Sequence, residues 1–331
     1  MRFISARLRA VTTLVCAAAF ALVPVSALPQ AYPAKSITLL SGASVGSVGD
    51  IGVRTVVARM AENIGRPIVV DARRGAGGLE AFSAAAKAEP NGYTLLFANI
   101  GLVTNKFLRR DWPVDALKDY THIVQLFSSP YFIAAPPGLP VNSMKELIDY
   151  ARQNPGKLTY ASTGVGSGAH LQGEAINLAA GTKMLHVPYT GNNAAMAVND
   201  LLTGRVDLYI SDLNAFAQHV AAGKLKLIAF VDKTRSRLRP EVQTVNEVVP
   251  NAYNIVVWWG ILAPANLPRA LVDRINAEAG KALSEPGILA KMSSLTVIPP
   301  NPNAPEEFAR QIASDVENLS KLVNALGLKP E

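Results

Sequence analysis

The sequence predicts an α/β protein of two domains, each built on a mostly parallel sheet. Short apolar runs of strand length alternate with segments of helical spacing, a pattern typical of such folds. The pattern restarts at Tyr131, so a second α/β unit follows the first. In each unit a loop of glycine, serine and small apolar residues lies between a strand and a helix, at 41–49 and at 162–168.

The first domain is predicted at residues 32–128 and 233–331, around the second domain at 129–232. Glycine and proline punctuate its elements, as at Gly65 and in the turn 90–92. Its predicted elements are the strand 37–40, the helix 51–64, the strand 67–70, the helix 79–88 and the strand 93–97, then the strand 256–263 and the helices 268–284, 286–293 and 304–326.

The second domain repeats this alternation. Ser143 is a candidate N-cap, and Glu146 lies three residues later, a spacing that predicts a capping box. The predicted elements are the strand 131–135, the helix 143–154, the strand 158–161, the helix 169–180, the strand 183–187, the helix 193–203, the strand 206–210, the helix 215–222 and the strand 225–230.

The two glycine-serine loops predict a ligand cleft. Ligands of open α/β sheets bind at the carboxyl ends of the strands, where both loops begin. The helix that follows each loop begins with unpaired N–H groups and the positive end of a dipole, which favour a carboxylate or a phosphate. Two such edges facing each other would form a cleft between the domains.

The N-terminus predicts a secretory signal peptide at residues 1–31. Three arginines and no acid precede an apolar run at 10–23, and Val25-Ser26-Ala27 fits a cleavage site, with Ala31 as a second choice. A membrane anchor is the alternative, although the apolar run is short for a span. The expected location is the bacterial periplasm.

Composition narrows the function further. Cys16 is the sole cysteine and lies in the predicted signal peptide, which excludes disulfides, cysteine metal sites and cysteine nucleophiles from the mature chain. The formal charge of +7 becomes +4 without the three arginines of that peptide, and no basic run stands out. Nucleic acid is therefore not an expected partner, and no cofactor is expected.

A serine hydrolase is an alternative from another class. Gly42-Ala43-Ser44-Val45-Gly46 matches the Gly-x-Ser-x-Gly nucleophile elbow at a strand–helix turn. Asp207 or Asp212, followed by His219, could complete a triad in chain order. The elbow of such enzymes, however, follows several strands, whereas this one follows the first strand of the mature chain.

Other motifs are weaker. Gly164-x-Gly166-x-Gly168 has Ala169 where a dinucleotide fingerprint has its third glycine, and no lysine of the phosphate-loop type follows either loop. No pair of histidines has metal-ligand spacing. His122 and His219 are interpreted as structural or surface residues. His170 and His186 are interpreted either as cleft donors or as structural residues.

Three further side chains have two possible roles each. Asp50 is interpreted as a helix cap or as a partner for a ligand ammonium or hydroxyl. Arg54 either pairs with Asp50 or reaches an anion. Trp258 and Trp259 point to opposite faces of a strand, so one is expected in the core and the other in the cleft.

The order and spacing of many short motifs resemble the substrate-binding receptors of tripartite tricarboxylate transporters, the Bug-type periplasmic solute-binding proteins. The resemblance covers nearly the whole mature chain. It rests on Tyr32-Pro33-Ala34-Lys35, Gly46-x-x-x-Asp50-x-x-x-Arg54, Arg73-x-Gly75-Ala76-Gly77-Gly78, Pro90-Asn91-Gly92-Tyr93-Thr94-Leu95, Leu117-Lys118-Asp119-Tyr120, residues 155–162, Gly166-Ser167-x-x-His170-Leu171, His186-Val187-Pro188-Tyr189-x-Gly191, Gly204-x-Val206-Asp207-Leu208, Trp258-x-Gly260-x-Leu262-Ala263-Pro264 and Pro305-Glu306-Glu307-Phe308.

The resemblance implies a type II periplasmic binding protein, or Venus flytrap, that closes around a small carboxylate gripped by backbone N–H groups and ordered waters. It implies a monomeric receptor without enzymatic activity that serves membrane permease subunits; a sensor partner of a histidine kinase is a further alternative. The expected ligand-binding residues are Ser41, Ser44, Gly46, Ser47, Val48, Asp50, Asn99, Ser162, Thr163, Gly166, Ser167, Gly168, His170, Pro188, Tyr189, Thr190, Asp212 and Trp258.

The chain departs from the family pattern in its first loop and around Arg73. Relatives usually begin the first loop with Pro-Phe/Tyr-x-x-Gly-Gly, whereas this chain has 40–47 as Leu-Ser-Gly-Ala-Ser-Val-Gly-Ser. The usual Asn-Arg-Pro-Gly becomes Ala-Arg-Arg-Gly at 72–75, and Leu79 replaces an asparagine. Ser47, in place of glycine, adds a hydroxyl at the cleft. The expected ligand is therefore left open among dicarboxylates, tricarboxylates, acidic amino acids and aromatic carboxylates.

Overall fold

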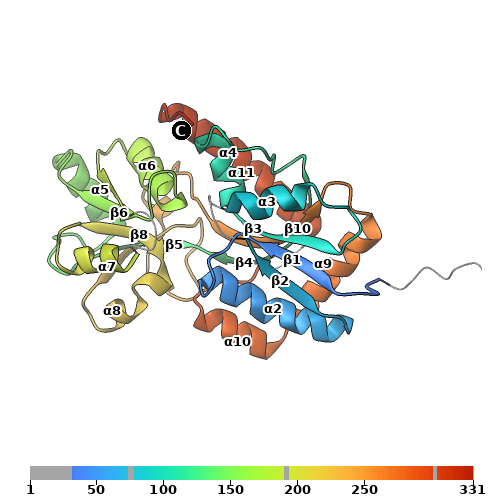
Figure 1. Cartoon of the computed structure of the whole chain (residues 1–331). Helices are drawn as coiled ribbons and strands as arrows, with labels where there is room; N and C mark the ends of the chain where they lie inside the picture. Colours follow the sequence, from blue (N-terminus) through green and yellow to red (C-terminus); the bar gives the residue numbers. More distant parts are fainter. Residues whose placement is uncertain (1–31, 74–77, 190–193, 301–303, 331) are drawn as a thin grey trace, which may run out of the picture. The chain divides into compact units, whose positions relative to one another are not determined.

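The structure is a computed structural model that describes residues 32–73, 78–189, 194–300 and 304–330 (Figure 1). The predicted signal peptide lies outside these residues. From Lys35 onward the chain clusters into one compact unit that contains two five-stranded sheets. Within the described ranges, no helix is both long and apolar enough to cross a membrane.

The first sheet has mixed strand directions. Strand β1 runs parallel to β2 and β3, whereas β10 runs antiparallel to β3 and β4. In sheet order, the strands are β2 (Ile68–Ala72), β1 (Ile37–Ser41), β3 (Thr94–Asn99), β10 (Val257–Pro264) and β4 (Tyr120–Ser129).

The second sheet repeats this arrangement. Strand β6 runs parallel to β7 and β8, and β5 runs antiparallel to β8 and β9. In sheet order, the strands are β7 (Leu185–Pro188), β6 (Thr159–Ser162), β8 (Leu208–Asp212), β5 (Tyr131–Ala135) and β9 (Lys226–Phe230).

The prediction of mostly parallel sheets is therefore wrong, because half of the strand pairs are antiparallel. The reason lies in how the chain passes between the sheets. Strand β4 ends at Ser129, and β5 begins at Tyr131, so only Pro130 separates a strand of the first sheet from a strand of the second. Strand β10 brings the chain back to the first sheet. Neither passage is a parallel crossover through a helix.

Helices cover both faces of each sheet. In Figure 1, α2 (Val48–Ile64) and α10 (Pro286–Ser294) lie on the opposite side of the first sheet from α3 (Leu79–Ala86), α4 (Gly101–Leu108) and α11 (Pro305–Ala325). Helix α9 (Arg269–Leu283) packs beside α2 and α10. On the second sheet, α5 (Met144–Gln153) and α6 (Gly168–Ala180) share one hydrophobic cluster, and α7 (Ala194–Leu202) contributes to another. The short α8 (Ala217–Ala221) follows β8.

The prediction passed over α4 and β4. Helix α4 begins without a side-chain cap, so it lacks the usual N-terminal signal. Strand β4 includes His122 and Gln125, and its pairing with β10 is interrupted by two register shifts, so its polar–apolar alternation is irregular. The predicted cap of α5 is confirmed, since Ser143 Oγ accepts the Glu146 amide; Glu146 itself accepts the Asn142 amide, one residue earlier than a capping box requires.

Candidate ligand-binding site

A cavity of about 1300 Å³ is lined by residues from both sheets. The loops after β1 and β6, the end of β8, the start of β10 and both ends of α4 all contribute to its wall. The cavity therefore lies at the carboxyl ends of parallel strands, where α/β sheets place their ligands. Its volume exceeds that of most sites for small molecules, so it has room for ordered water beside a small solute.

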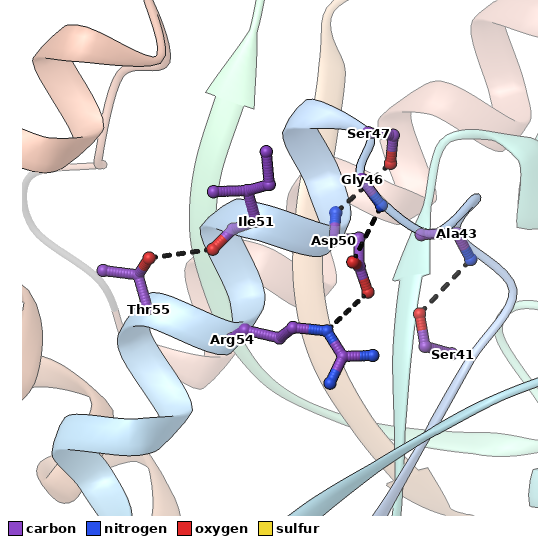
Figure 2. Close-up of polar contacts among 8 residues, drawn as sticks. All are labelled: Ser41, Ala43, Gly46, Ser47, Asp50, Ile51, Arg54 and Thr55. Atoms are coloured by element: carbon purple, nitrogen blue, oxygen red, sulfur yellow. Dashed lines mark hydrogen bonds and ion pairs between the residues drawn. The ribbon is translucent and has the colours of Figure 1, made fainter.

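The first loop carries a serine-capped helix start (Figure 2). Ser47 is the N-cap of α2, and its Oγ accepts the Asp50 amide at 3.3 Å. The Asp50 carboxylate accepts the Gly46 amide at 3.0 Å through one oxygen and the Arg54 Nε at 2.9 Å through the other. Behind the loop, Ser41 Oγ accepts the Ala43 amide. These contacts fix the loop and orient the first turn of α2.

The second loop has the same construction. Ser167 is the N-cap of α6, and its Oγ accepts the His170 amide at 3.2 Å. The Gly166 amide donates to His170 Nδ1 at 3.0 Å. Behind this loop, Ser162 Oγ accepts the Gly164 amide. Gly46 and Gly166 both have a positive φ, 79° and 76°, a conformation that glycine adopts without strain.

These caps leave hydrogen-bond donors on residues that line the cavity. The first amides of a helix have no intrahelical acceptor, and each N-cap serine satisfies only the third one. Val48 and Gly49 at the start of α2 and Gly168 at the start of α6 all line the cavity. Asn99 Oδ1 already accepts the Gly101 amide, so its NH₂ group is left as a further donor at this edge.

His170 and His186 are held as neutral rings. His170 Nδ1 accepts a backbone amide, so the proton of this neutral ring lies on Nε2. Burial lowers the pKa of His170, and the Glu174 carboxylate partly offsets this shift. His186 stacks on His170 with 4.1 Å between ring centroids, and its Nε2 lies 2.6 Å from Ser162 Oγ. Burial, followed by repulsion from His170, lowers the pKa of His186 to about 4.

Asp212 is an acidic group in this cavity. It ends β8 and lies opposite Tyr131 in the antiparallel pairing with β5. Burial raises the pKa of Asp212, and nearby backbone amides, including those of Asn214 and Ala215, partly offset the rise. Burial and the charge of Asp212 also raise the pKa of the Tyr131 phenol, which therefore remains protonated at neutral pH.

Basic side chains lie at another part of the wall. Arg109 and Arg110 follow α4, and Lys329 belongs to the C-terminal segment 327–330, which also lines the cavity. Arg109 makes two hydrogen bonds to Asp111, and Arg110 Nε donates to the Pro330 carbonyl. These cations give the cavity an electrostatic attraction for anions, weakened where they are exposed to solvent.

Half of the expected binding residues line this cavity and most of the others are structural. Those that line it are Ser47, Val48, Asn99, Thr163, Gly166, Ser167, Gly168, His170 and Asp212. Those that the cavity lining does not include are Ser41, Ser44, Gly46, Asp50, Ser162, Pro188, Tyr189 and Trp258. Thr190 lies outside the described residues.

The residues outside the lining have identifiable positions. Ser41 and Ser162 are fully buried behind their loops, where they hold loop amides. Asp50 is buried and accepts the Gly46 amide, so it stabilises the helix start, although Ser47 rather than Asp50 is the N-cap. Gly46 provides the turn before that cap.

Three other expected binding residues, Pro188, Tyr189 and Trp258, also lie outside the cavity lining. Tyr189 is buried, and its hydroxyl donates to Asp200, while Pro188 is exposed on β7. Trp258 is fully buried, and its Nε1 donates to Asp315. The tryptophan that lines the cavity is therefore Trp259, which stacks on Phe97.

Sequence reasoning missed several lining residues. Asn105, Arg109 and Arg110 belong to or follow α4, a helix that was itself missed. Tyr131 was assigned only to a strand, and the tail 327–330 lies far along the chain from the two loops. An N-cap residue before α4 could have indicated this helix and with it Asn105, Arg109 and Arg110. The N-cap position is occupied by Ile100, whose side chain cannot cap a helix.

The hydrolase alternative gains no support from the geometry. Ser44 is exposed, and its side chain has no hydrogen bond to a histidine in the part of the chain that the structure describes. Asp207 accepts the amide and hydroxyl of Thr159, which is a structural role. Among the described residues, no cluster of histidine and acidic side chains could hold a metal ion.

Two mixed sheets with helices on both faces and a shared cavity define a two-domain periplasmic binding protein fold. A solved structure described as the periplasmic binding protein BugD has a TM-score of 0.73 and 26% identity, covering 91% of this chain and 100% of that one. The R. palustris protein Rpa4515, solved with adipate, has a TM-score of 0.76 and 28% identity over the same shares of the two chains.

The sequence comparisons give the family. Residues 53–328 match the family described as tripartite tricarboxylate transporter family receptor, and the chain belongs to this family. A curated relative from Pseudomonas sp. strain P51, a UPF0065 protein encoded between tcbD and tcbE, is 32% identical over 295 residues, which are 89% of this chain and 87% of the relative. The family and the solved relatives are solute-binding proteins, so the predicted family and fold are confirmed.

Proposed function

We propose that this chain is a periplasmic receptor that captures a small carboxylate in the cavity between its two sheets and delivers it to a tripartite tricarboxylate transporter. Family membership supports the transporter assignment. The solved relative with adipate, at 28% identity, supports a carboxylate as the ligand. The receptor has no catalytic role in this proposal.

The observation that carries this proposal is the pair of serine-capped helix starts on one cavity. Ser47 follows a strand of the first sheet and Ser167 a strand of the second, yet both line the cavity. Each of the two helix starts presents the positive end of a helix dipole and unpaired amides to this cavity. A carboxylate has two oxygens with lone pairs and can therefore accept hydrogen bonds from both helix starts. A ligand bound to both loops stabilises the closed arrangement, because only that arrangement allows both sets of contacts.

The remaining parts of the proposal concern export and partners. Residues 1–31 would direct export and be removed, leaving a monomer in the periplasm. The closed, loaded receptor would dock on the membrane permease subunits of its transporter. Binding residues would include those expected residues that line the cavity, together with Trp259, Tyr131 and the side chains at the end of α4.

A ligand panel tests the proposal. The mature chain is heated with dicarboxylates, tricarboxylates, amino acids and aromatic carboxylates, and unfolding is followed by fluorescence. A ligand at about 100 times its Kd adds about 2.7 kcal/mol to the free energy of unfolding, which raises Tm by about 4 °C for a chain of this size. Calorimetry then gives the affinity. No stabilisation by any carboxylate, or labelling of Ser44 by a fluorophosphonate, contradicts the proposal.

A further inference from the structure

The segment 253–258 leads into β10, carries the chain back to the first sheet and is tied to α11. The Tyr253 hydroxyl donates to Asp315 Oδ1, and Trp258 Nε1 donates to Asp315 Oδ2, each at 2.8 Å. Asp315 is buried on α11, which packs against β4 of the first sheet. One carboxylate therefore holds both ends of this return segment to a helix of the first sheet.

A glutamine of α6 holds the middle of the same segment. Gln172 is fully buried, and its Oε1 accepts the Ile255 amide at 2.7 Å. Leu171 and Ala175, also on α6, belong to the hydrophobic cluster that contains Ile255 and Trp258. Helix α6 packs on the second sheet and begins at the cavity. It therefore joins the helix start that would meet a ligand to the return segment and, through that segment, to the first sheet.

Both passages of the chain between the sheets contact α6 at Gly168, in its first turn. A Cβ placed on Gly168 would lie 2.8 Å from the Tyr131 hydroxyl, at the start of β5, and 3.2 Å from Ile255 Cγ2. Gly168 itself lines the cavity. The turn that offers amides to a carboxylate thus contacts the two segments whose backbone must rotate when the sheets move relative to each other.

Stability alone does not explain a glutamine at position 172. Gln172 Nε2 is buried and has no hydrogen-bond partner among the residues that the structure describes. A buried donor without a partner destabilises the fold, a cost that an apolar side chain of similar size would not carry. Side chains that break a packing rule in this way are expected at functional positions.

We propose that Gln172 is a positioning residue for ligand capture: its hydrogen bond to Ile255 couples the start of α6 to the return segment, so that a carboxylate bound there draws the two sheets together. This inference rests on the proposed capture of a carboxylate. A ligand shifts an equilibrium between two arrangements only as far as it binds them with different affinities. Without the Gln172 bond, α6 meets the ligand while the return segment stays in place, and part of that difference is lost.

The test follows both affinity and closure. The probes are succinate, adipate, citrate, glutamate and benzoate, and calorimetry gives the affinity for each. Energy transfer between dyes on Glu62→Cys of α2 and Lys145→Cys of α5, two exposed positions, reports movement of the sheets. A chain that begins at Tyr32 has no cysteine of its own, so the dyes attach at these two positions alone.

Two variants of α6 are compared. Gln172→Met removes the bond to Ile255 and keeps a side chain of similar size. Asn177→Leu is the matched control, because Asn177 is also a buried amide of α6, but its side chain bonds Met184 and Thr182, just beyond the same helix. We expect Gln172→Met to lower the affinity for the best probe about tenfold, the range for one hydrogen bond, and to reduce the change in energy transfer. Asn177→Leu should lower Tm and leave both unchanged.

A milder variant tests the other attachment of the return segment. Tyr253→Phe removes the hydroxyl that donates to Asp315 and leaves the ring in place. We expect it to weaken binding of the same probe a few-fold and to reduce the change in energy transfer. If Gln172→Met does not fold, this variant decides the question, and unchanged affinity in Tyr253→Phe then overturns the inference.

The remaining outcomes separate this inference from the proposed function. Wild-type affinity and closure in Gln172→Met, equal losses of affinity in Gln172→Met and Asn177→Leu, or binding by the wild-type chain without a change in energy transfer each overturn the role of Gln172 and leave the proposed function standing. Absence of binding by every probe to the wild-type chain rejects the proposed function itself, and this inference with it.

Discussion

The loops before α2 and α6 build the same helix start from different chemistry. In both, a serine caps the helix and a preceding glycine donates its amide to the side chain three residues beyond the serine. In the first loop that side chain is Asp50, buried and paired with Arg54. In the second it is His170, neutral and part of the cavity wall.

Because of this difference, the two loops offer different hydrogen-bond donors to a ligand. The Asp50 carboxylate accepts hydrogen bonds from the Gly46 amide and from Arg54 Nε. The first loop can therefore bind a ligand carboxylate only through its serine and backbone donors. His170 instead keeps its Nε2–H, which gives the second loop an additional donor at the cavity. The capping geometry is therefore shared, whereas the side-chain contribution to binding is expected from the second loop.

The largest effect is expected from placing a negative charge at either cap. Aspartate is as good an N-cap as serine, so Ser47→Asp and Ser167→Asp should keep the fold while repelling the ligand carboxylate. We expect each variant to lose about 100-fold or more in affinity by calorimetry, with little change in Tm. Ser143→Asp, at the equivalent position of α5 outside this cavity, is the matched control. Unchanged binding in Ser167→Asp would show that the second loop is not part of the site.

A smaller effect is expected from an alanine in each turn. Gly46→Ala and Gly166→Ala both force a residue with a Cβ into positive φ and should each lower the free energy of unfolding by about 1 kcal/mol. Only at Gly166 would the Cβ meet a neighbour, 2.8 Å from Leu108 Cδ1 on α4; at Gly46 nothing lies within 4 Å.

Gly166→Ala should therefore also weaken ligand binding several-fold, because its Cβ must displace the Leu108 side chain, which lines the cavity. Gly46→Ala should leave the affinity close to that of the wild-type chain. Denaturant unfolding and calorimetry measure the two quantities separately, and Leu108→Ala should restore affinity to Gly166→Ala. Equal losses of affinity in the two glycine variants would refute this cross-cavity contact.

The third effect is a loss of stability in acid. The pKa of His186 is about 4 in the folded chain, against an ordinary value of 6.5, so the unfolded chain takes up the proton first as pH falls. Stability from the neutral ring is full above pH 6.5 and is lost as pH falls toward 4. Protonation of His170 would also remove the acceptor of the Gly166 amide.

Hydrogen exchange can locate this acid effect. Between pH 7 and pH 4, after correction for intrinsic rates, protection of the Gly166 amide should fall more than that of the Gly46 amide. His186→Gln should flatten the pH dependence of the free energy of unfolding over the same interval. Equal loss of protection in both loops would place the acid sensitivity elsewhere.

The sequence predicts those parts of the molecule whose signals are local. The strand, glycine-serine loop and helix around Ser47, and again around Ser167, were predicted because each signal lies within a few residues. The mixed strand directions of the two sheets were not predicted, because they depend on how β4 and β10 carry the chain from one sheet to the other. Periodicity also placed Trp258 and Trp259 on opposite faces without indicating which face holds the cavity.

The missed part of the site has the same cause. Arg109 and the tail 327–330 reach the cavity through packing of α4 and α11, which no local pattern encodes. Asp212 lines the cavity, but the backbone amides of Asn214 and Ala215 beside its carboxylate became apparent only from the structure. Sequence patterns therefore located the two loops, and tertiary contacts distinguished their roles.

A crystal structure of the mature chain with the best ligand from the panel tests the central claim most directly. We expect one ligand carboxylate within hydrogen-bonding distance, directly or through one water, of donors at the start of α2 and at the start of α6. A carboxylate bound only at Arg109, Arg110 or Lys329, with both helix starts occupied by solvent alone, would contradict the account.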